Sequence, residues 1–371
     1  YKPAIVHFNH NLRPDAAQDA AFAKQFAAKH NLPFHTETWQ HGEVPINQVQ
    51  QAARVARYGW LHSVCAQQGY EALLTGHTAT DVLETFFQRL ARGSGGDGLH
   101  VLTAEGKLGN LPLYRPLVSM GRDNLRAYLR EQGQNWQDDP SNEDETFTRV
   151  RWRKLLPELH KLGITEDTMQ ATQHSLARMN GFINRHMEKS YNQNLVARCP
   201  LFMCFKEEVL DNDVELTFRL INAICQQLVP GSFRPRTQEK ADLIAALQKG
   251  EGRTLGHLKW EAQDGLLYAA LEHAPDIAPT EIVDDTLHTE AFWLDNLGPF
   301  VGQKVMSGSH LQKDMRMMFY KNLPLPRHIR HSLPVVTNGT EVTACADVLT
   351  TFAPQKVPGF KIMGKTPLIP C

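Results

Sequence analysis

The sequence predicts an α/β protein: a parallel sheet with helices on both faces, followed by a helical region and a small mixed C-terminal region. Short apolar runs alternate with helix-length amphipathic segments over the first hundred or so residues. The composition shifts between Pro275 and Pro279, before strands and turns rich in Gly and Pro. Because 371 residues exceed one hydrophobic core, we expect three domains, at residues 1–160, 161–275 and 276–371.

The expected elements follow in chain order. Strands are predicted at residues 4–8, 34–39 and 72–75, alternating with helices at 15–30 and 47–68 and a helix that begins near Thr80 or Asp81. This alternation predicts parallel strands joined by right-handed crossovers. Further helices are expected at residues 121–132, 165–193, 218–229 and 238–248, while the stretch after Gly98 is typical of a loop.

Composition excludes some classes of partner. The chain is 42% hydrophobic and 21% charged, with a formal net charge of -1, so nucleic acid could be bound only through local basic patches. We find no run of 18 apolar residues and no signal peptide, and expect no membrane partner. Six cysteines without C-x-x-C spacing predict a reduced cytoplasmic protein with structural thiols.

The stretch from Leu73 to Gly95 is the clearest candidate site. His77 follows a short buried strand, and Asp81 and Glu84 share one face of the next helix, away from its apolar stripe. Such a group suits metal, phosphate or proton transfer. The alternative is structural, with Asp81 as N-cap and Glu84 completing its capping box. The apolar stripe comprises Val82, Leu83, Phe86, Phe87 and Leu90.

Other polar clusters distinguish less clearly between a functional site and an ordinary structural role. His7, His10 and His77 could form a metal cluster, but H-x-x-H on a loop is weak evidence. The basic run at residues 149–154 is either a solvated helix face, which its spacing favours, or a phosphate contact. Residues 311–331 are the best local candidate for contact with backbone phosphates, with an ordinary basic surface helix as the alternative.

Taken in order, six motifs resemble the tRNA(Ile)-lysidine synthetases, members of the ATP-pyrophosphatase or PP-loop superfamily. The resemblance is strong through Pro157 and thin between about Gly181 and Pro299. It implies an adenine nucleotide alpha hydrolase-like fold. The motifs are HFNHNLRP at 7–14, QQAARVARY at 50–58, LLTGHTATDVLETFFQRLARGSGGDGL at 73–99, RPL from Arg115, DDPSNEDETFTRVRWRKLLP at 138–157 and LPRHIRHSLPVV at 325–336.

The resemblance implies a ligase that forms a C–N bond. Such enzymes use ATP to adenylate the C2 oxygen of the wobble cytidine in a CAU-anticodon tRNA(Ile). The amine of free L-lysine then displaces AMP, which gives lysidine. ATP and Mg²⁺ are therefore the expected cofactors, and tRNA(Ile) and lysine the expected partners. The oligomeric state is left open, with a homodimer as one alternative.

The resemblance also implies roles for individual residues. The catalytic residues would be Asp81, Glu84, Arg149 and Arg153, with Asp81 and Glu84 also holding Mg²⁺ or the lysine amine. ATP would contact His7, His10, Arg54, Arg57, His77 and Arg92. The tRNA would contact the domains at 161–275 and 276–371, and the basic residues Arg151, Lys154, Lys313, Arg316, Lys321, Arg327 and Arg330.

The chain departs from the family pattern in two places. Thr80 stands where the family more often has Asp. The family's Ser-Gly-Gly-x-Asp-Ser phosphate loop would precede Tyr1, so we expect a truncated sequence that binds ATP poorly. The Gly93–Gly96 loop is no substitute, because it follows a helix.

Two alternative functions stay open. One is another PP-loop tRNA-modifying enzyme, such as a thiolase. Thiolases commonly need a sulfur-carrying cysteine near the site, and Cys65 is the only cysteine in the first predicted domain. The other is a non-catalytic tRNA-binding paralogue.

Overall fold

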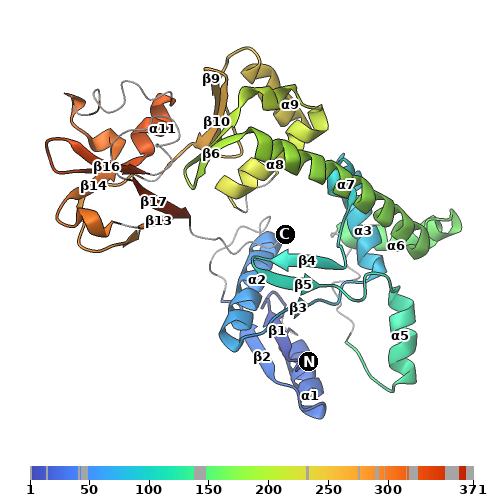
Figure 1. The fold of residues 1–371 in the computed structure, drawn as a ribbon. Coiled ribbons are helices and arrows are strands. Elements are labelled where there is room, and N and C mark those ends of the chain that lie inside the picture. Colours follow the sequence, from blue (N-terminus) through green and yellow to red (C-terminus); the bar gives the residue numbers. More distant parts are fainter. Residues whose placement is uncertain are drawn as a thin grey trace. The chain divides into compact units, whose positions relative to one another are not determined.

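The structure, a computed structural model, describes residues 2–13, 16–40, 42, 49–137, 148–230, 234–274, 276–288, 292–295, 297–314, 316, 325–346 and 359–364. The chain divides into two compact units, Tyr1–Gly181 and Phe182–Pro367, which are described separately (Figure 1). The division into three domains stays a prediction.

The first unit contains the predicted alternation of strands and helices. Strands β1 (Ile5–Asn9) and β2 (Phe34–Thr38) pair in parallel, and β3 (Leu73–Leu74) pairs in parallel with β5 (Leu111–Tyr114). These parallel pairs confirm the predicted α/β class. The connecting helices are α1 (Ala16–Lys29) and α2 (Val49–Gln68).

One part of this unit was predicted wrongly. The stretch after Gly98 forms an antiparallel hairpin of β4 (Glu105–Leu108) and β5 instead of a loop. Its four-residue strands are too short to show clear alternation, and they turn at Gly109, whose φ of 61° is in the left-handed region. The hairpin buries Leu108 and Leu113 against α2 in a core with Tyr58, Leu61, Cys65 and Leu73.

Helix α3 (Ala79–Leu90) packs against α6 (Thr148–Lys161). Val82 and Leu83 of α3 are buried with Leu156 of α6, and the Phe87 and Trp152 rings stack with centroids 5.2 Å apart. The predicted apolar stripe is thus buried in its first turns, whereas Leu90 at its end is exposed. The remaining helices that begin in this unit are α4 (Gly96–Leu99), α5 (Arg122–Glu131) and α7 (Glu166–Asn194).

The second unit begins with the end of α7 and contains the predicted helical region. Helices α8 (Val214–Leu228) and α9 (Thr237–Leu247) cover a five-stranded antiparallel sheet that was not predicted. The strands lie in the order β6 (Leu195–Cys199), β7 (Phe202–Lys206), β10 (Leu266–Leu271), β9 (Leu258–Gln263) and β8 (Arg253–Leu255).

The C-terminal region is mixed, as predicted. One parallel pair, β16 with β17, lies in an otherwise antiparallel sheet, and α11 (Arg327–Ser332) packs beside it. Among the described residues, no helix is long and apolar enough to cross a membrane. The strand order is β11 (Thr280–Glu281), β14 (Lys304–Ser307), β15 (Pro334–Thr337), β16 (Val342–Ala346), β17 (Gly359–Gly364), β13 (Phe292–Asp295) and β12 (Leu287–His288).

Candidate functional site

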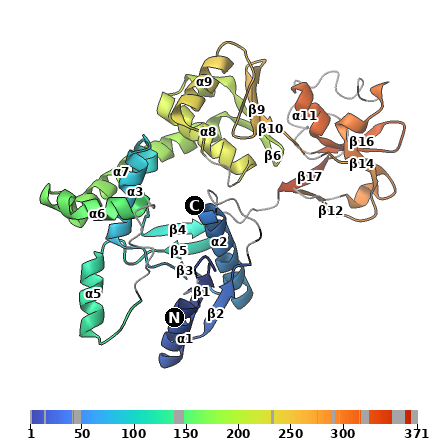
Figure 2. The same ribbon diagram turned by 180° about the vertical axis from the view of Figure 1, so that it is seen from behind.

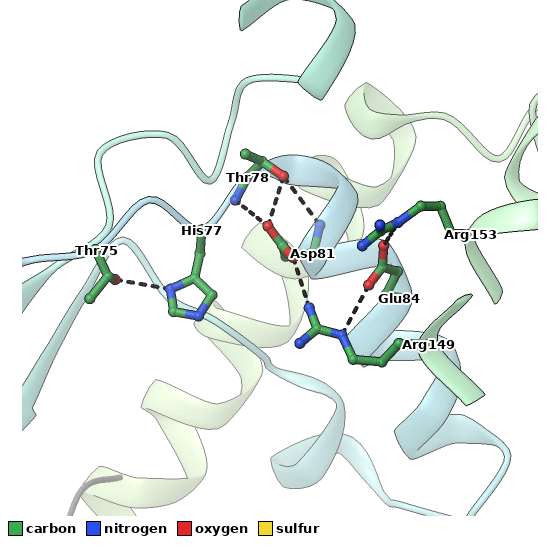
Figure 3. A network of polar contacts seen from close by, with 7 residues as sticks. All are labelled: Thr75, His77, Thr78, Asp81, Glu84, Arg149 and Arg153. Atoms are coloured by element: carbon green, nitrogen blue, oxygen red, sulfur yellow. Dashed lines mark hydrogen bonds and ion pairs between the residues drawn. The ribbon is translucent and has the colours of Figure 1, made fainter. Parts of the chain in front are cut away.

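The candidate site begins where α3 starts, just beyond the carboxyl end of β3. Thr78 is the N-cap, and its hydroxyl oxygen accepts a hydrogen bond from the Asp81 amide at 3.4 Å. In return, Asp81 Oδ2 accepts from the Thr78 amide and hydroxyl, each at 2.8 Å (Figure 3). The capping box is therefore Thr78 with Asp81, and the interpretation of Asp81 as N-cap with Glu84 is wrong.

Two arginines of α6 cover the acidic face of α3 (Figure 3). Arg149 donates from Nε to Glu84 Oε2 at 3.0 Å and from Nη2 to Asp81 Oδ1 at 2.8 Å. Arg153, one turn further along α6, donates from Nε to Glu84 Oε1 at 2.6 Å. The four predicted catalytic residues thus form one network across the α3–α6 interface.

The network is buried at Glu84 and open to solvent at Arg149. The Glu84 side chain is 0% exposed, whereas that of Arg149 is 50% exposed. A buried carboxylate is costly unless it is paired and hydrogen-bonded, and each oxygen of Glu84 receives one guanidinium. The network is therefore anchored at Glu84 and presents Arg149 to solvent.

His77 lies next to this network. Its Nδ1 is 2.9 Å from the Thr75 hydroxyl oxygen. Burial lowers the pKa of His77; the Asp81 carboxylate opposes this shift, and Arg115, Arg54 and Arg57 add to it. The imidazole is therefore neutral at pH 7, in surroundings that already hold several cationic groups.

The predicted ATP contacts on β1 and α2 also gather near one another. The Arg54 and Arg57 guanidiniums lie over the Tyr58 ring, 4.8 Å and 4.9 Å from its centroid. Burial and then Arg57 lower the pKa of His10, and burial lowers that of His7. The Nδ1 atoms of both histidines are buried without a hydrogen-bond partner among the described residues. Each imidazole therefore carries a buried polar atom whose hydrogen-bonding capacity the described residues leave unsatisfied.

Arg115 is a residue of this group that was not predicted as part of the site. It follows β5 directly, is 6% exposed and donates from Nη1 to the Thr103 carbonyl oxygen at 2.9 Å. Because β5 pairs in parallel with β3, both carboxyl ends lie at one edge, and the Arg115 charge acts on His77. The RPL motif begins at Arg115, but its proximity to His77 depends on the β5 strand, which the sequence did not reveal.

Three predicted residues of the first unit lie outside the network. Arg92 follows the C-terminal end of α3, whereas Asp81 lies in its first turn. Arg151 and Lys154 are exposed on α6, where Arg151 Nη2 donates to the Thr148 hydroxyl at 3.2 Å. Their assignments to ATP and tRNA stay predictions.

In the second unit, part of the predicted basic group comes together. Arg316, Arg327 and Arg330 each lower the pKa of His331, after the larger effect of burial, so all three charges lie close enough to act on this imidazole. His331 was not among the predicted contacts, although it directly follows Arg330. Lys313 is exposed, and Lys321 lies outside the described residues.

Asp81 and Glu84 are the predicted ligands of Mg²⁺. Among the described residues, no three His, Cys, Asp or Glu side chains gather as ligands for a metal ion. Asp81 and Glu84 have all four carboxylate oxygens engaged, three of them by guanidiniums. Their negative charge is thus already matched by arginine, and the pair does not fit a hard cation in this arrangement.

Comparisons with known proteins agree with the motifs. A model of the PP-loop domain matches residues 1–159. The chain is 38% identical over 178 residues to a tRNA(Ile)-lysidine synthase of Bradyrhizobium sp. (strain BTAi1), a match that covers 48% of this chain and 49% of that one. To the tRNA(Ile)-lysidine synthase of Anaplasma marginale it is 26% identical, with 68% of this chain and 54% of that one covered.

The chain spans about half the length of the curated relatives it matches. A solved U34-tRNA thiolase, NcsA of Methanococcus maripaludis, overlaps 47% of this chain and 60% of that one, with 11% identity and a TM-score of 0.39. That likeness is too loose to bear on function. Residues 1–159 therefore form a PP-loop domain, and the resemblance of this chain to the tRNA(Ile)-lysidine synthases is confirmed.

Proposed function

We propose that this protein is an ATP-dependent ligase that joins L-lysine to C2 of the wobble cytidine of a CAU-anticodon tRNA(Ile), through an adenylated tRNA intermediate. The observation that carries the proposal is the Arg149 bridge between Asp81 and Glu84, in a PP-loop domain and near two further arginines. Relatives of similar sequence are named tRNA(Ile)-lysidine synthases.

The chemistry fits these residue types. Adenylyl transfer develops negative charge on phosphate oxygens, and Arg149 keeps half of its side-chain surface exposed to meet it. Arg57 adds positive charge near His10, and Arg54 lies with Arg57 over the Tyr58 ring. Mg²⁺ would assist phosphate chemistry when bound, but Asp81 and Glu84 do not fit it in this arrangement.

The lysine amine must lose a proton before it attacks C2. Neutral His77 can accept that proton, and the nearby Asp81 carboxylate would stabilise the imidazolium that forms. Asp81 is also the more exposed of the two acids, with 12% of its side chain accessible against 0% for Glu84. The ammonium of lysine would therefore be received at Asp81, in exchange for one hydrogen bond from Arg149.

The test is incorporation of radiolabelled lysine into a CAU-anticodon tRNA transcript by the complete protein, with and without ATP. We expect ATP-dependent incorporation that Asp81→Asn and Arg149→Met reduce at least a hundredfold, as loss of a group acting on the transition state does. Glu158→Gln on α6, whose pair with Lys161 is exposed, is the matched control and should keep full activity. Absence of ATP-dependent lysine incorporation would refute the proposal.

The same assay separates the alternatives. A non-catalytic paralogue would bind the tRNA without incorporating lysine. A thiolase would need a reactive thiol, but Cys65 is buried and burial raises its pKa. No described contact favours sulfur transfer, and thiolated nucleosides that disappear on gene deletion would be the evidence for it.

A further inference from the structure

A single tyrosine on α2 contacts both arginines of that helix that were predicted to bind ATP. Arg54 lies one turn before Tyr58, and Arg57 directly precedes it. Their guanidinium carbons are 4.8 Å and 4.9 Å from the centroid of the Tyr58 ring. Both distances are within the range of a cation–π interaction, so one ring stabilises the positions of two cations.

The Tyr58 ring is itself fixed by the core. It is 2% exposed and belongs to a cluster that α2 shares with β3, β4 and β5 (Figures 1 and 2). Leu73, Leu108 and Leu113 supply the strand side of this cluster. Because close packing leaves such a ring little freedom, it positions the two guanidiniums relative to the sheet.

The two arginines repel each other, and Tyr58 offsets that repulsion. Burial lowers the pKa of Arg57. The Tyr58 side chain opposes this shift, in part as a hydrogen-bond acceptor for Arg57, and the charges of Arg54 and Arg149 add to it. In the described part of the chain, no carboxylate pairs with Arg54 or Arg57. Two cations held together without an acid favour a ligand that carries more than one negative charge.

This pair of arginines lies within electrostatic reach of the candidate site on α3. Burial is the main cause of the lowered pKa of His77 and of His10, and the charge of Arg57 adds to both shifts. Arg54 adds to that of His77. Because interactions between charges weaken with distance, the α2 arginines and the Arg149 bridge share one electrostatic environment.

We propose that Tyr58 is a positioning residue, whose ring and hydroxyl hold the Arg54 and Arg57 guanidiniums in the arrangement that binds the triphosphate of ATP. This inference rests on the proposed function, because it takes the anion to be ATP. As the bond between the α-phosphorus and the leaving pyrophosphate breaks, negative charge grows on the pyrophosphate oxygens. Guanidiniums that are already in place stabilise this charge without the cost of ordering two flexible side chains.

Binding of inorganic pyrophosphate to the full chain, measured by isothermal titration calorimetry, tests this role. In Tyr58→Leu both guanidiniums lose the ring, so binding must immobilise two freed side chains. Immobilising one such side chain weakens binding about 2- to 12-fold, so Kd should rise about 5- to 150-fold. Tyr58→Phe keeps the ring and should recover most of the affinity. An unchanged Kd in Tyr58→Leu would overturn the inference.

A fluorine series separates positioning from an effect on the fold. Phenylalanines with increasing numbers of ring fluorines at position 58 keep the shape of the ring but weaken its negative face. Kd for pyrophosphate should rise with each added fluorine, while a constant Kd across the series would show that the ring acts only through packing. This series decides the question even where Tyr58→Leu does not fold.

The structural control is Leu61→Ala, which disturbs the same core one turn further along α2. Its folded form should bind pyrophosphate as the parent does. A rise in Kd equal to that of Tyr58→Leu would overturn the inference, because it would reflect damage to the core. Circular dichroism of each variant confirms that the measured chain is folded.

The outcomes separate this inference from the proposed function. If pyrophosphate binding depends on Tyr58 but no lysine is incorporated into tRNA, the positioning role stands and the ligase proposal fails. If lysine is incorporated and Tyr58→Leu binds pyrophosphate normally, only the positioning role is refuted. A parent chain that does not bind pyrophosphate refutes the positioning role whether or not lysine is incorporated.

Discussion

Replacing Glu84 by Gln tests whether the network on α3 holds α6 in place. Glu84 is fully buried, and its two oxygens each accept a hydrogen bond from a different arginine of α6. In the Gln variant one oxygen becomes an amide nitrogen, so one arginine donor faces another donor. The negative charge that balanced Arg149 and Arg153 is also lost.

The free-energy cost of Glu84→Gln depends on whether each arginine keeps another hydrogen-bond partner or access to water. Arg149 is half exposed and keeps its hydrogen bond to Asp81, whereas the Arg153 side chain is only 22% exposed. Removing one partner of a buried pair costs about 3–5 kcal/mol, and recovery by Arg149 places this case near 3 kcal/mol. Opening of α6 should then be favoured about 150-fold relative to the parent.

Hydrogen exchange followed by mass spectrometry measures that opening in α6 itself. Amides of α6 should exchange about 150-fold faster in Glu84→Gln, while those of α8 in the second unit stay unchanged. The control is Glu158→Gln, whose exposed pair with Lys161 should change exchange less than about threefold. Adding Arg153→Met to Glu84→Gln should cost little more, because the pair is already broken. If α6 exchanged equally slowly in Glu84→Gln and the control, the reasoning would be wrong.

Three further predictions concern the second unit. Burial, followed by Lys259, lowers the pKa of His328 to about 4, although Glu261 Oε2 lies 3.6 Å from its Nδ1. An unfolded histidine has a pKa of about 6.5, so between pH 6.5 and 4 the unfolded chain binds more protons than the folded chain. The free energy of unfolding should therefore decrease by up to about 3 kcal/mol as the pH is lowered from 6.5 to 4. Urea denaturation checks this, and His328→Phe should flatten the loss. Burial raises the thiol pKa values of Cys199, Cys204 and Cys225 to about 12, so these thiols should react slowly with a thiol-specific reagent at pH 8 until the chain unfolds. Fast native labelling of Cys204 or Cys225 would contradict their burial. Gly256→Ala should destabilise this unit by about 1–3 kcal/mol more than Gly250→Ala, because both glycines have positive φ but only the Gly256 Cβ would meet Cys225 Sγ, at 2.7 Å. Equal denaturation midpoints for the two variants would refute this packing argument.

Several elements could be predicted because their signals are local. The helices at α2, α7 and α9 follow from apolar periodicity and end within a few residues of their predicted bounds. The β4–β5 hairpin and the sheet of β6 to β10 were missed, because short strands paired at a distance leave little local pattern.

The candidate site was also predictable only in part. The sequence alone determined that His77, Asp81 and Glu84 lie between a strand end and the first turns of a helix, since strand, turn and helical spacing are local properties. Only the tertiary structure decided what these groups do to one another. It placed α6 across α3, so that Glu84 is buried between two arginines, and it paired β5 with β3, so that Arg115 acts on His77. Burial and the distance between charges govern pairing and pKa, and both depend on segments that lie far apart in the chain.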